Sequence, residues 1–385
     1  MPGPGLAELL GVSSHAKQCS RGAGGPFLST LTWKRECPHA PDVSDYIPIL
    51  KWKQGEQQAL ANLHAEDKVK ITPLLEILTD PEDGYAQLAK TIVRSWGSDK
   101  PVMLDLGALE HPLVEMAYAQ FREAGIAAIP VAGVYRDLDL QEATAVVCKR
   151  DRLGLCLRIT PEDIAEPTFE ADLDAALESL QVGQGQVDVV FDGGYLLSAP
   201  GVSTGSMAFT ALGFMQAIPY LDRWRTITYA AGSFPETLQS VGTGSKDLAR
   251  AEWDIWRQLS RRMPKVQFGD YAVAHPHYRE SRHTGSAAIR YTVDGHWLIH
   301  RGHRLIGGAY GGYEQFHDLS RALQTESRFK GPTFSWGDHY VAQCAERSVS
   351  SGNATTWRAV ATNHHIAFVL DALASPPATS GIPGR

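Results

Sequence analysis

Short apolar runs alternate with longer amphipathic stretches along most of the chain. Each run ends on a polar or charged residue, after which a loop and a helical stretch follow, as in Val187–Tyr195, VDVVFDGGY. The unit recurs at a mean spacing of about thirty residues, which is the size of a strand-plus-helix repeat. Alternating strands and helices predict a parallel sheet, and eight such units close an α/β fold of the (β/α)8 TIM-barrel type.

This pattern predicts eight strands and the helices between them. The predicted strands are Tyr46–Trp52, Ile71–Leu78, Pro101–Leu106, Ala127–Tyr135, Gly154–Ile159, Val187–Phe191, Arg225–Ala231 and Gln267–Ala274. The predicted helices are Gly55–Leu63, Tyr85–Trp96, His111–Ala124, Leu140–Arg150, Ala171–Leu180, Thr204–Ile218 and Lys246–Leu259. Thr160, followed by Pro161 and two acidic residues, is typical of a helix start, because the acids face the positive end of the helix dipole.

After Pro276 the pattern changes. Asp294-Gly295 lies between Ala287–Tyr291 and His296–Arg301 and predicts a β-hairpin, because both turn residues tolerate a positive φ. Two further helices are predicted at Trp336–Arg347 and Thr355–Leu373. The predicted organisation is a flexible extension at 1–44, the barrel at 45–280, the hairpin with C-terminal helices packed on the barrel at 281–374, and a disordered tail at 375–385.

Composition and charge narrow the class of protein. Apolar residues make up 43% and charged residues 21%, as in ordinary globular proteins. The net charge of −7 argues against tight, sequence-independent binding to nucleic acid. The chain has no apolar run of 18 residues and no signal-peptide pattern, so neither a membrane span nor secretion is predicted. The cysteines are scattered (Cys19, Cys37, Cys148, Cys156 and Cys344), which favours reduced thiols in the cytoplasm.

Polar residues gather where the predicted strands end, which is the face that carries the active site in barrels of this type. They are Lys51, Lys53, Glu76, Asp105, Arg136, Arg158, Asp192, Ser233, His275 and His277. Burying a lone charge is costly, and these charges exceed what packing requires, so they predict a pocket. The alternative is that they pair with one another as a structural network at the rim.

The residue types suggest roles in such a pocket. Lys51, Lys53, Arg136 and Arg158 suit a phosphate or carboxylate ligand, with Gly193 and Tyr195 completing the predicted ligand-binding set. Glu76, Asp105 and Asp192 suit proton transfer, with Mg²⁺ as the candidate cofactor, and His275 or His277 suits a general acid or base. No cysteine or histidine spacing indicates a dedicated metal site. A lysine closing the first strand also suits a Schiff base with pyridoxal phosphate, but nothing else in the sequence supports that cofactor.

A second polar cluster lies near the C-terminus, around Gly352–Arg358 (GNATTWR) and Asn363-His364-His365. Asn353 or Thr355 suits the N-cap of the last helix, and the apolar positions behind it predict packing on the barrel. The adjacent histidines face different ways on a helix and cannot easily bind one ion. We therefore interpret this cluster as residues that cap the last helix and pack it on the barrel.

Several stretches resemble the beta protein family, which is named for a bacteriophage protein. They are Tyr46–Glu56 (YIPILKWKQGE), Pro73–Ile77 (PLLEI), Ile289–Thr292 (IRYT), GNATTWR and Asn363-His-His. The resemblance extends over about residues 46–373 and implies a phage-related setting, such as phage–host conflict. It carries over no catalytic residues, but it implies a fold-specific role for Arg358 and Asn363.

Two hypotheses about function follow. The first is an enzyme, or former enzyme, that acts on an anionic ligand such as a phosphoester or nucleotide, by metal-assisted hydrolysis. The second is a sensor or scaffold without turnover, which binds a small ligand or a protein partner. Catalysis requires two carboxylates that converge on one substrate atom, whereas neutralised Asp–Arg and Glu–Lys pairs favour the scaffold.

Overall fold

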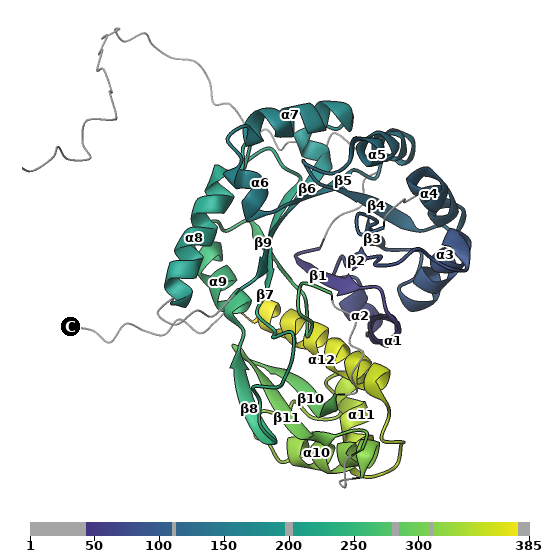
Figure 1. Ribbon diagram of the computed structural model, residues 1–385, viewed down its shortest axis with the longest axis vertical. Coiled ribbons are helices and arrows are strands. Elements are labelled where there is room, and N and C mark those ends of the chain that lie inside the picture. The colour runs from purple at the N-terminus through teal and green to yellow at the C-terminus, as the bar shows by residue number, and fades with distance from the viewer. Residues whose placement is uncertain (1–43, 110–112, 197–202, 279–284, 308–310, 376–385) are drawn as a thin grey trace, which may run out of the picture. The chain divides into compact units, whose positions relative to one another are not determined.

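The computed structural model describes residues 44–109, 113–196, 203–278, 285–307 and 311–375. Eight parallel strands form a closed barrel in the order β1-β2-β3-β4-β5-β6-β7-β9 (Figure 1), which confirms the predicted fold class. The strands are β1 Tyr46–Lys51, β2 Leu74–Glu76, β3 Pro101–Asp105, β4 Ala127–Ala132, β5 Leu155–Ile159, β6 Val187–Tyr195, β7 Thr226–Gly232 and β9 Val266–Asp270. The predicted extension 1–44 lies outside the described residues except for Ser44, and the predicted tail 375–385 lies outside them except for Ser375.

Helices surround the barrel, as the alternating pattern predicts. They are α1 Gln54–Ala61, α2 Ala65–Lys68, α3 Gly84–Ser95, α4 Val114–Glu123, α5 Leu138–Asp151, α6 Pro161–Ala165, α7 Phe169–Ser179, α8 Thr204–Ala217 and α9 Ala251–Ser260. Thr160 caps α6: its hydroxyl accepts from the Asp163 N–H at 3.3 Å, and the Asp163 carboxylate accepts from the Thr160 N–H at 2.8 Å. This reciprocal capping box ends the loop that follows β5 at the mouth of the barrel.

The register of the first strands sets the mouth of the barrel. Lys51 pairs with Glu76, and Glu76 pairs with Asp105, so three charged residues lie at one level. Leu74 and Met103 lie two residues earlier on the same faces and belong to the core inside the barrel. The interior is therefore apolar below this level and charged at it.

The remaining strands form a separate antiparallel sheet in the order β10-β11-β8. Its hairpin, β10 Ser286–Val293 and β11 His296–Arg304, turns at Gly295 with φ of 65°, in agreement with the Asp294-Gly295 signal. Strand β8, Gly244–Ala249, corrects the prediction of a helix over Lys246–Leu259, since the helix begins only at Ala251. The sequence of β8, GSKDLA, is polar and mostly exposed, and it becomes a strand because β11 supplies its backbone hydrogen-bond partners.

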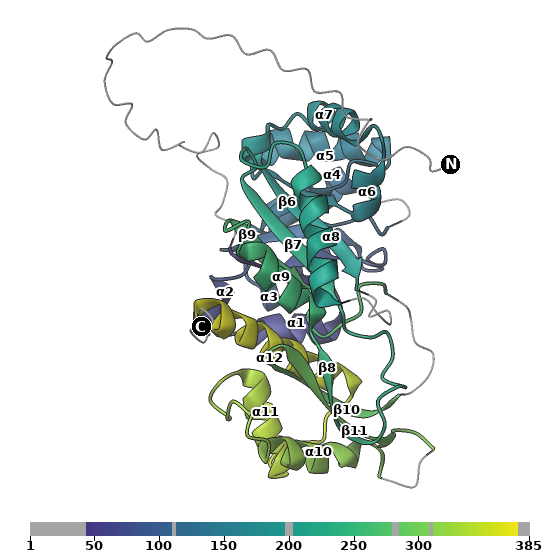
Figure 2. The same ribbon diagram turned by 90° about the vertical axis from the view of Figure 1, so that its left-hand side faces the viewer.

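Three helices complete the C-terminal region: α10 Gln315–Gln324, which was not predicted, α11 Trp336–Ala345 and α12 Ala354–Ala374. Figure 2 shows α12 between the barrel helix α1 and the antiparallel sheet. Asn353 caps α12 by accepting the Thr356 N–H at 3.0 Å, as predicted. Asn363 in α12 donates to the Ala59 carbonyl of α1 and accepts from the Gly337 N–H of α11, both at 3.0 Å. None of the described helices combines the length and hydropathy that a membrane span requires.

Candidate functional site

A cavity of about 720 Å³ opens at the C-terminal ends of the barrel strands. We call it the mouth cavity. Seven of the residues proposed from the sequence line it: Lys51, Glu76, Arg158, Asp192, Gly193, Tyr195 and His277. Further lining residues that the sequence analysis did not select include Thr160, Glu162, Gly194, Tyr271 and Tyr278. Lys53, Asp105, Arg136 and His275 are not among the lining residues.

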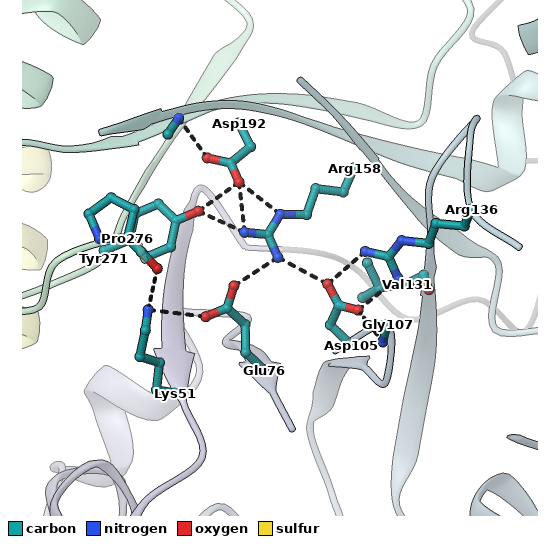
Figure 3. Close-up of polar contacts among 11 residues, drawn as sticks. Lys51, Glu76, Asp105, Gly107, Val131, Arg136, Arg158, Asp192, Tyr271 and Pro276 are labelled. Atoms are coloured by element: carbon teal, nitrogen blue, oxygen red, sulfur yellow. Dashed lines mark hydrogen bonds and ion pairs between the residues drawn. The ribbon is translucent and has the colours of Figure 1, made fainter. Parts of the chain in front are cut away.

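Arg158 is the centre of the polar floor of this cavity (Figure 3). Its Nε and Nη2 lie 2.8 Å and 2.6 Å from Asp192 Oδ2. Its Nη1 lies 2.9 Å from Glu76 Oε1 and 3.0 Å from Asp105 Oδ2. A guanidinium has five N–H groups, and the fifth donates from Nη2 to the Tyr271 hydroxyl at 2.7 Å. A ligand can therefore reach an Arg158 N–H only by displacing one of these partners.

Asp105 supports Arg158 from below the cavity. Arg136 binds it through two parallel hydrogen bonds of 2.7 Å and 2.8 Å, and the Gly107 N–H donates to it at 2.9 Å. Burial alone would raise the pKa of Asp105, but the charges and hydrogen bonds of Arg136 and Arg158 outweigh burial and lower it to about 2. Asp105 is therefore a permanent anion that positions two arginines.

Lys51 differs from Arg158 because one of its three N–H groups has no hydrogen-bond partner among the described residues. Its Nζ donates to the Pro276 carbonyl at 2.6 Å and to Glu76 Oε2 at 3.3 Å, and an ammonium group has three donors. The side chain is 8% exposed and lines the cavity. Burial lowers the pKa of Lys51, with the charge of Glu76 opposing that effect. This amine can therefore offer a hydrogen bond to a ligand, and it loses its proton more readily than an exposed lysine.

Tyr271 and Asp192 close the other side of the floor. The Tyr271 hydroxyl donates to Asp192 Oδ2 at 2.6 Å, and the Gly194 N–H donates to Asp192 Oδ1 at 2.9 Å. Gly194 has φ of 60°, which glycine adopts without strain. Tyr271 was not among the site residues predicted from the sequence. The eighth strand was predicted to end at Ala274, which placed Tyr271 within the barrel wall. The strand ends at Asp270, so Tyr271 lies at the mouth.

The remaining predicted residues lie at the rim. The His275 ring packs on Tyr195 with centroids 4.2 Å apart, and its Nδ1 accepts from the His277 N–H at 3.1 Å. Burial lowers the pKa of His275. Lys53 hydrogen-bonds to the Tyr278 hydroxyl and lies 3.9 Å from the centroid of that ring. His275 and the exposed Lys53 thus each contact one aromatic side chain of the rim.

The charges of the floor neutralise one another. We call Lys51, Glu76, Asp105, Arg136, Arg158, Asp192 and Tyr271 the mouth network; it holds three cations and three carboxylates, and each carboxylate contacts at least one cation. Among the described residues, no three His, Cys, Asp or Glu side chains converge as ligands of one ion. The donor set of the mouth does not fit Mg²⁺, because Arg158 occupies the point on which its carboxylates converge.

Comparison with known proteins places the chain in a family. The family model described as Beta protein matches residues 46–371, from the first residue of β1 into the last helix α12. A search of curated proteins found no match. The family match agrees with the resemblance seen in the sequence and covers the barrel, the antiparallel sheet and the C-terminal helices. The chain therefore belongs to the beta protein family.

Proposed function

We propose that the protein binds a small polar ligand with an anionic group in the mouth cavity and acts as a sensor. The pairing of the carboxylates of the mouth network with cations carries this proposal. Glu76, Asp105 and Asp192 each contact lysine or arginine within 3.3 Å. Such a floor is an ordered hydrogen-bonding surface, which recognises a ligand without needing to transform it.

The lining residues indicate which ligand fits. Lys51 has one N–H without a hydrogen-bond partner in the part of the chain that the structure describes, so an anionic group would bind beside it. Glu76, Asp192 and Glu162 also line the cavity, and carboxylates accept hydrogen bonds. The ligand must therefore also carry hydroxyl or amino donors. A sugar phosphate or a nucleotide has both features and fits a cavity of about 720 Å³.

A thermal-shift screen against nucleotides, sugar phosphates and hydroxy acids would test this proposal. A ligand at 100 times its Kd should stabilise the protein by about 2.7 kcal/mol. The screen should be repeated with Lys51→Met and with Lys53→Met as a matched control, since Lys53 does not line the cavity. We expect the shift to persist in Lys53→Met and to be lost in Lys51→Met. A shift that Lys51→Met retains would contradict binding at the mouth.

Hydrolysis of the same ligand is the second candidate function, and Lys51 is the observation that favours it. Because burial lowers the pKa of its amine, Lys51 could serve as a general base that the carboxylates cannot provide. A hit from the screen should be incubated with the protein and followed by ³¹P NMR. Turnover that rises with pH and disappears in Lys51→Met would establish the enzyme, whereas an unchanged spectrum would leave the sensor.

The biological setting that we propose is the cytoplasm of a phage-infected cell. The family resemblance supports the phage connection, and the described cysteines Cys148, Cys156 and Cys344 are free thiols, as a reducing compartment favours. Plating efficiency of a phage panel should change in cells that produce the protein. Lys51→Met should abolish the change and Lys53→Met should not. If the Lys51→Met protein changes plating as much as the wild type does, the mouth cavity has no part in it.

A further inference from the structure

A second cavity, of about 220 Å³, lies beside the mouth cavity. We call it the side cavity. It is lined from α8 by Met207, Ala211 and Phe214, and from β6 and β7 by Phe191 and Tyr229. This composition contrasts with the charged floor of the mouth, because none of the lining residues of the side cavity is charged.

The two cavities adjoin. Pro161 and Gly193 line both of them, and Gly193 directly follows Asp192 of the mouth network. A Cβ atom at Gly193 would lie 3.4 Å from the Ala231 Cβ and 3.8 Å from the Tyr229 Cε2, which are ordinary contacts. The backbone therefore does not require glycine here, unlike at Gly194 with its positive φ. Gly193 and Pro161 therefore form a wall that the two cavities share.

The side cavity also holds a polar group without a partner. Tyr229 is 1% exposed, and its hydroxyl has no hydrogen-bond partner among the described residues. Buried polar groups are almost always paired, so an exception of this kind calls for an explanation. An apolar group in the side cavity would not pair with this hydroxyl, so the hydroxyl does not bear on what fills the cavity.

We infer that the ligand of the mouth cavity is amphipathic: its anionic head lies beside Lys51, and a short apolar chain or ring lies in the side cavity. The inference rests on the proposed function, because it assigns the apolar part of the same ligand. The lining that the two cavities share at Pro161 and Gly193 and the uncharged walls around Phe191 and Phe214 carry it. Water in such a space gains few hydrogen bonds, so an apolar group would displace it favourably.

Binding of n-alkyl phosphates to the full chain would test the inference by calorimetry. The probes run from inorganic phosphate through ethyl phosphate to hexyl phosphate. Each added methylene should tighten binding about fourfold until the side cavity is filled. Thr210→Phe, at the exposed edge of the side cavity, and Ala211→Phe, within it, should abolish this dependence on chain length. Both variants should still bind inorganic phosphate, since neither residue lines the mouth.

The matched control is Gln216→Phe, which adds the same side chain to α8 at an exposed position outside the side cavity. It should keep the dependence on chain length. If Ala211→Phe fails to fold, Thr210→Phe still tests the inference. Equal affinity for all chain lengths in the wild type would overturn the amphipathic ligand and leave the proposed function standing. No binding of any probe, phosphate included, would also overturn the amphipathic ligand, and the thermal-shift screen with sugar phosphates and nucleotides would decide the proposed function separately.

Discussion

Two networks of buried charged side chains differ in what lies beside them. The first is the mouth network, which borders a cavity of about 720 Å³. The second we call the seam network, which consists of Arg250, Glu252, Asp270, Thr292, Asp338, His364 and His365. Each of its residues is at most 1% exposed, and none of them lines the mouth cavity or the side cavity. Similar residue types therefore form a solvent-facing surface in one place and a sealed joint in the other.

The barrel side of the seam is formed by Asp270 and His365. The His365 Nε2–H donates to Asp270 Oδ2 at 2.8 Å, and its Nδ1 accepts from the Thr292 hydroxyl at 2.8 Å. Burial lowers the pKa of His365, so the ring is neutral. Burial would raise the pKa of Asp270, but the hydrogen bond from His365 and the charge of Arg250 lower it. Asp270 is therefore ionised and joins its barrel strand to α12.

The other side of the seam is formed by His364. The His364 ring faces Asp338 Oδ2 through Nδ1 and the Thr292 carbonyl through Nε2, both at 2.8 Å. Its two nitrogens therefore connect a side chain of α11 with the backbone of β10. The ring also stacks on Tyr291 with centroids 3.8 Å apart. As the sequence predicts, the two histidines face different partners, and they tie the barrel to α11 through α12.

The comparison shows why charge within an apolar run does not by itself mark a functional site. Ser233 was one of the polar strand-end residues, yet its hydroxyl donates to Glu252 of the seam at 2.6 Å. Glu76 was another, and it lines the mouth cavity. Both are polar and near strand ends. Only the cavity beside Glu76 separates a ligand-binding arrangement from a structural one, and a cavity has no signature in the sequence.

The largest expected effect is the loss of a seam charge. Asp270→Ala would remove the acceptor of the His365 Nε2–H and of the Tyr46 hydroxyl and one of the two anionic partners of Arg250. Removing one partner of a sealed ion pair costs about 3–5 kcal/mol. Asp192→Ala at the mouth should cost at most about half as much, because water in the cavity can solvate the freed Arg158. Urea unfolding of both variants measures the difference. Equal losses would remove the distinction between the two regions.

The mouth also shows which residues of a site the sequence can predict and which it cannot. Lys51, Glu76 and Asp105 were found because strand periodicity and the rule for barrel active sites together place them at the mouth. Tyr271 was missed because an error of a few residues in the end of a strand decides whether a side chain lies in the wall or at the mouth.

Contacts between residues that are far apart in the sequence could not be predicted, for a different reason. Asp270 and His365 are 95 residues apart, and strand β8 owes its conformation to β11 rather than to its own polar sequence. Local propensity and periodicity carry no information about such partners. The capping of α12 by Asn353 was predictable because its partner lies only three residues away.

The second prediction concerns pH and the seam. Burial raises the pKa of Glu252 to about 7, with Arg250 opposing and Asp270 reinforcing that rise. The folded state therefore holds this proton more tightly than the unfolded chain, and stability falls as pH rises from about 4.5 to 7, by about 3 kcal/mol. Urea unfolding should therefore show the free energy of unfolding of Glu252→Gln rising relative to that of the wild type, by about 3 kcal/mol, between pH 5 and pH 8. The control Glu115→Gln, at an exposed position, should show the same pH dependence of unfolding free energy as the wild type. The same pH dependence in Glu252→Gln would contradict a raised pKa of Glu252.

The third prediction concerns the mouth, where stability should fall as pH decreases rather than as pH increases. The pKa of Asp105 is lowered to about 2 from 3.8, so its contribution to stability is fully present above pH 4 and is lost as pH falls toward 2. The shift corresponds to about 2 kcal/mol, of which roughly half is lost by pH 3. Asp105→Asn should therefore be less stable than the wild type at pH 6, with a deficit that shrinks at pH 3. A deficit that does not change with pH would mean that the arginines do not hold this anion.

The smallest effect on stability, and the sharpest test of the comparison, is expected for Lys51→Met. Glu76 keeps Arg158 at 2.9 Å after the substitution, and the buried ammonium group is itself unfavourable, as its lowered pKa shows. We therefore expect a change in unfolding free energy within about 1 kcal/mol, similar to that of an ordinary substitution. Binding of the mouth ligand should nevertheless be lost, while Lys53→Met keeps both properties. A residue that the ligand needs and the fold does not is what separates the mouth from the seam, where the loss of Asp270 alone should cost about 3–5 kcal/mol. A loss of 3 kcal/mol or more in Lys51→Met would instead make the mouth network a second structural joint.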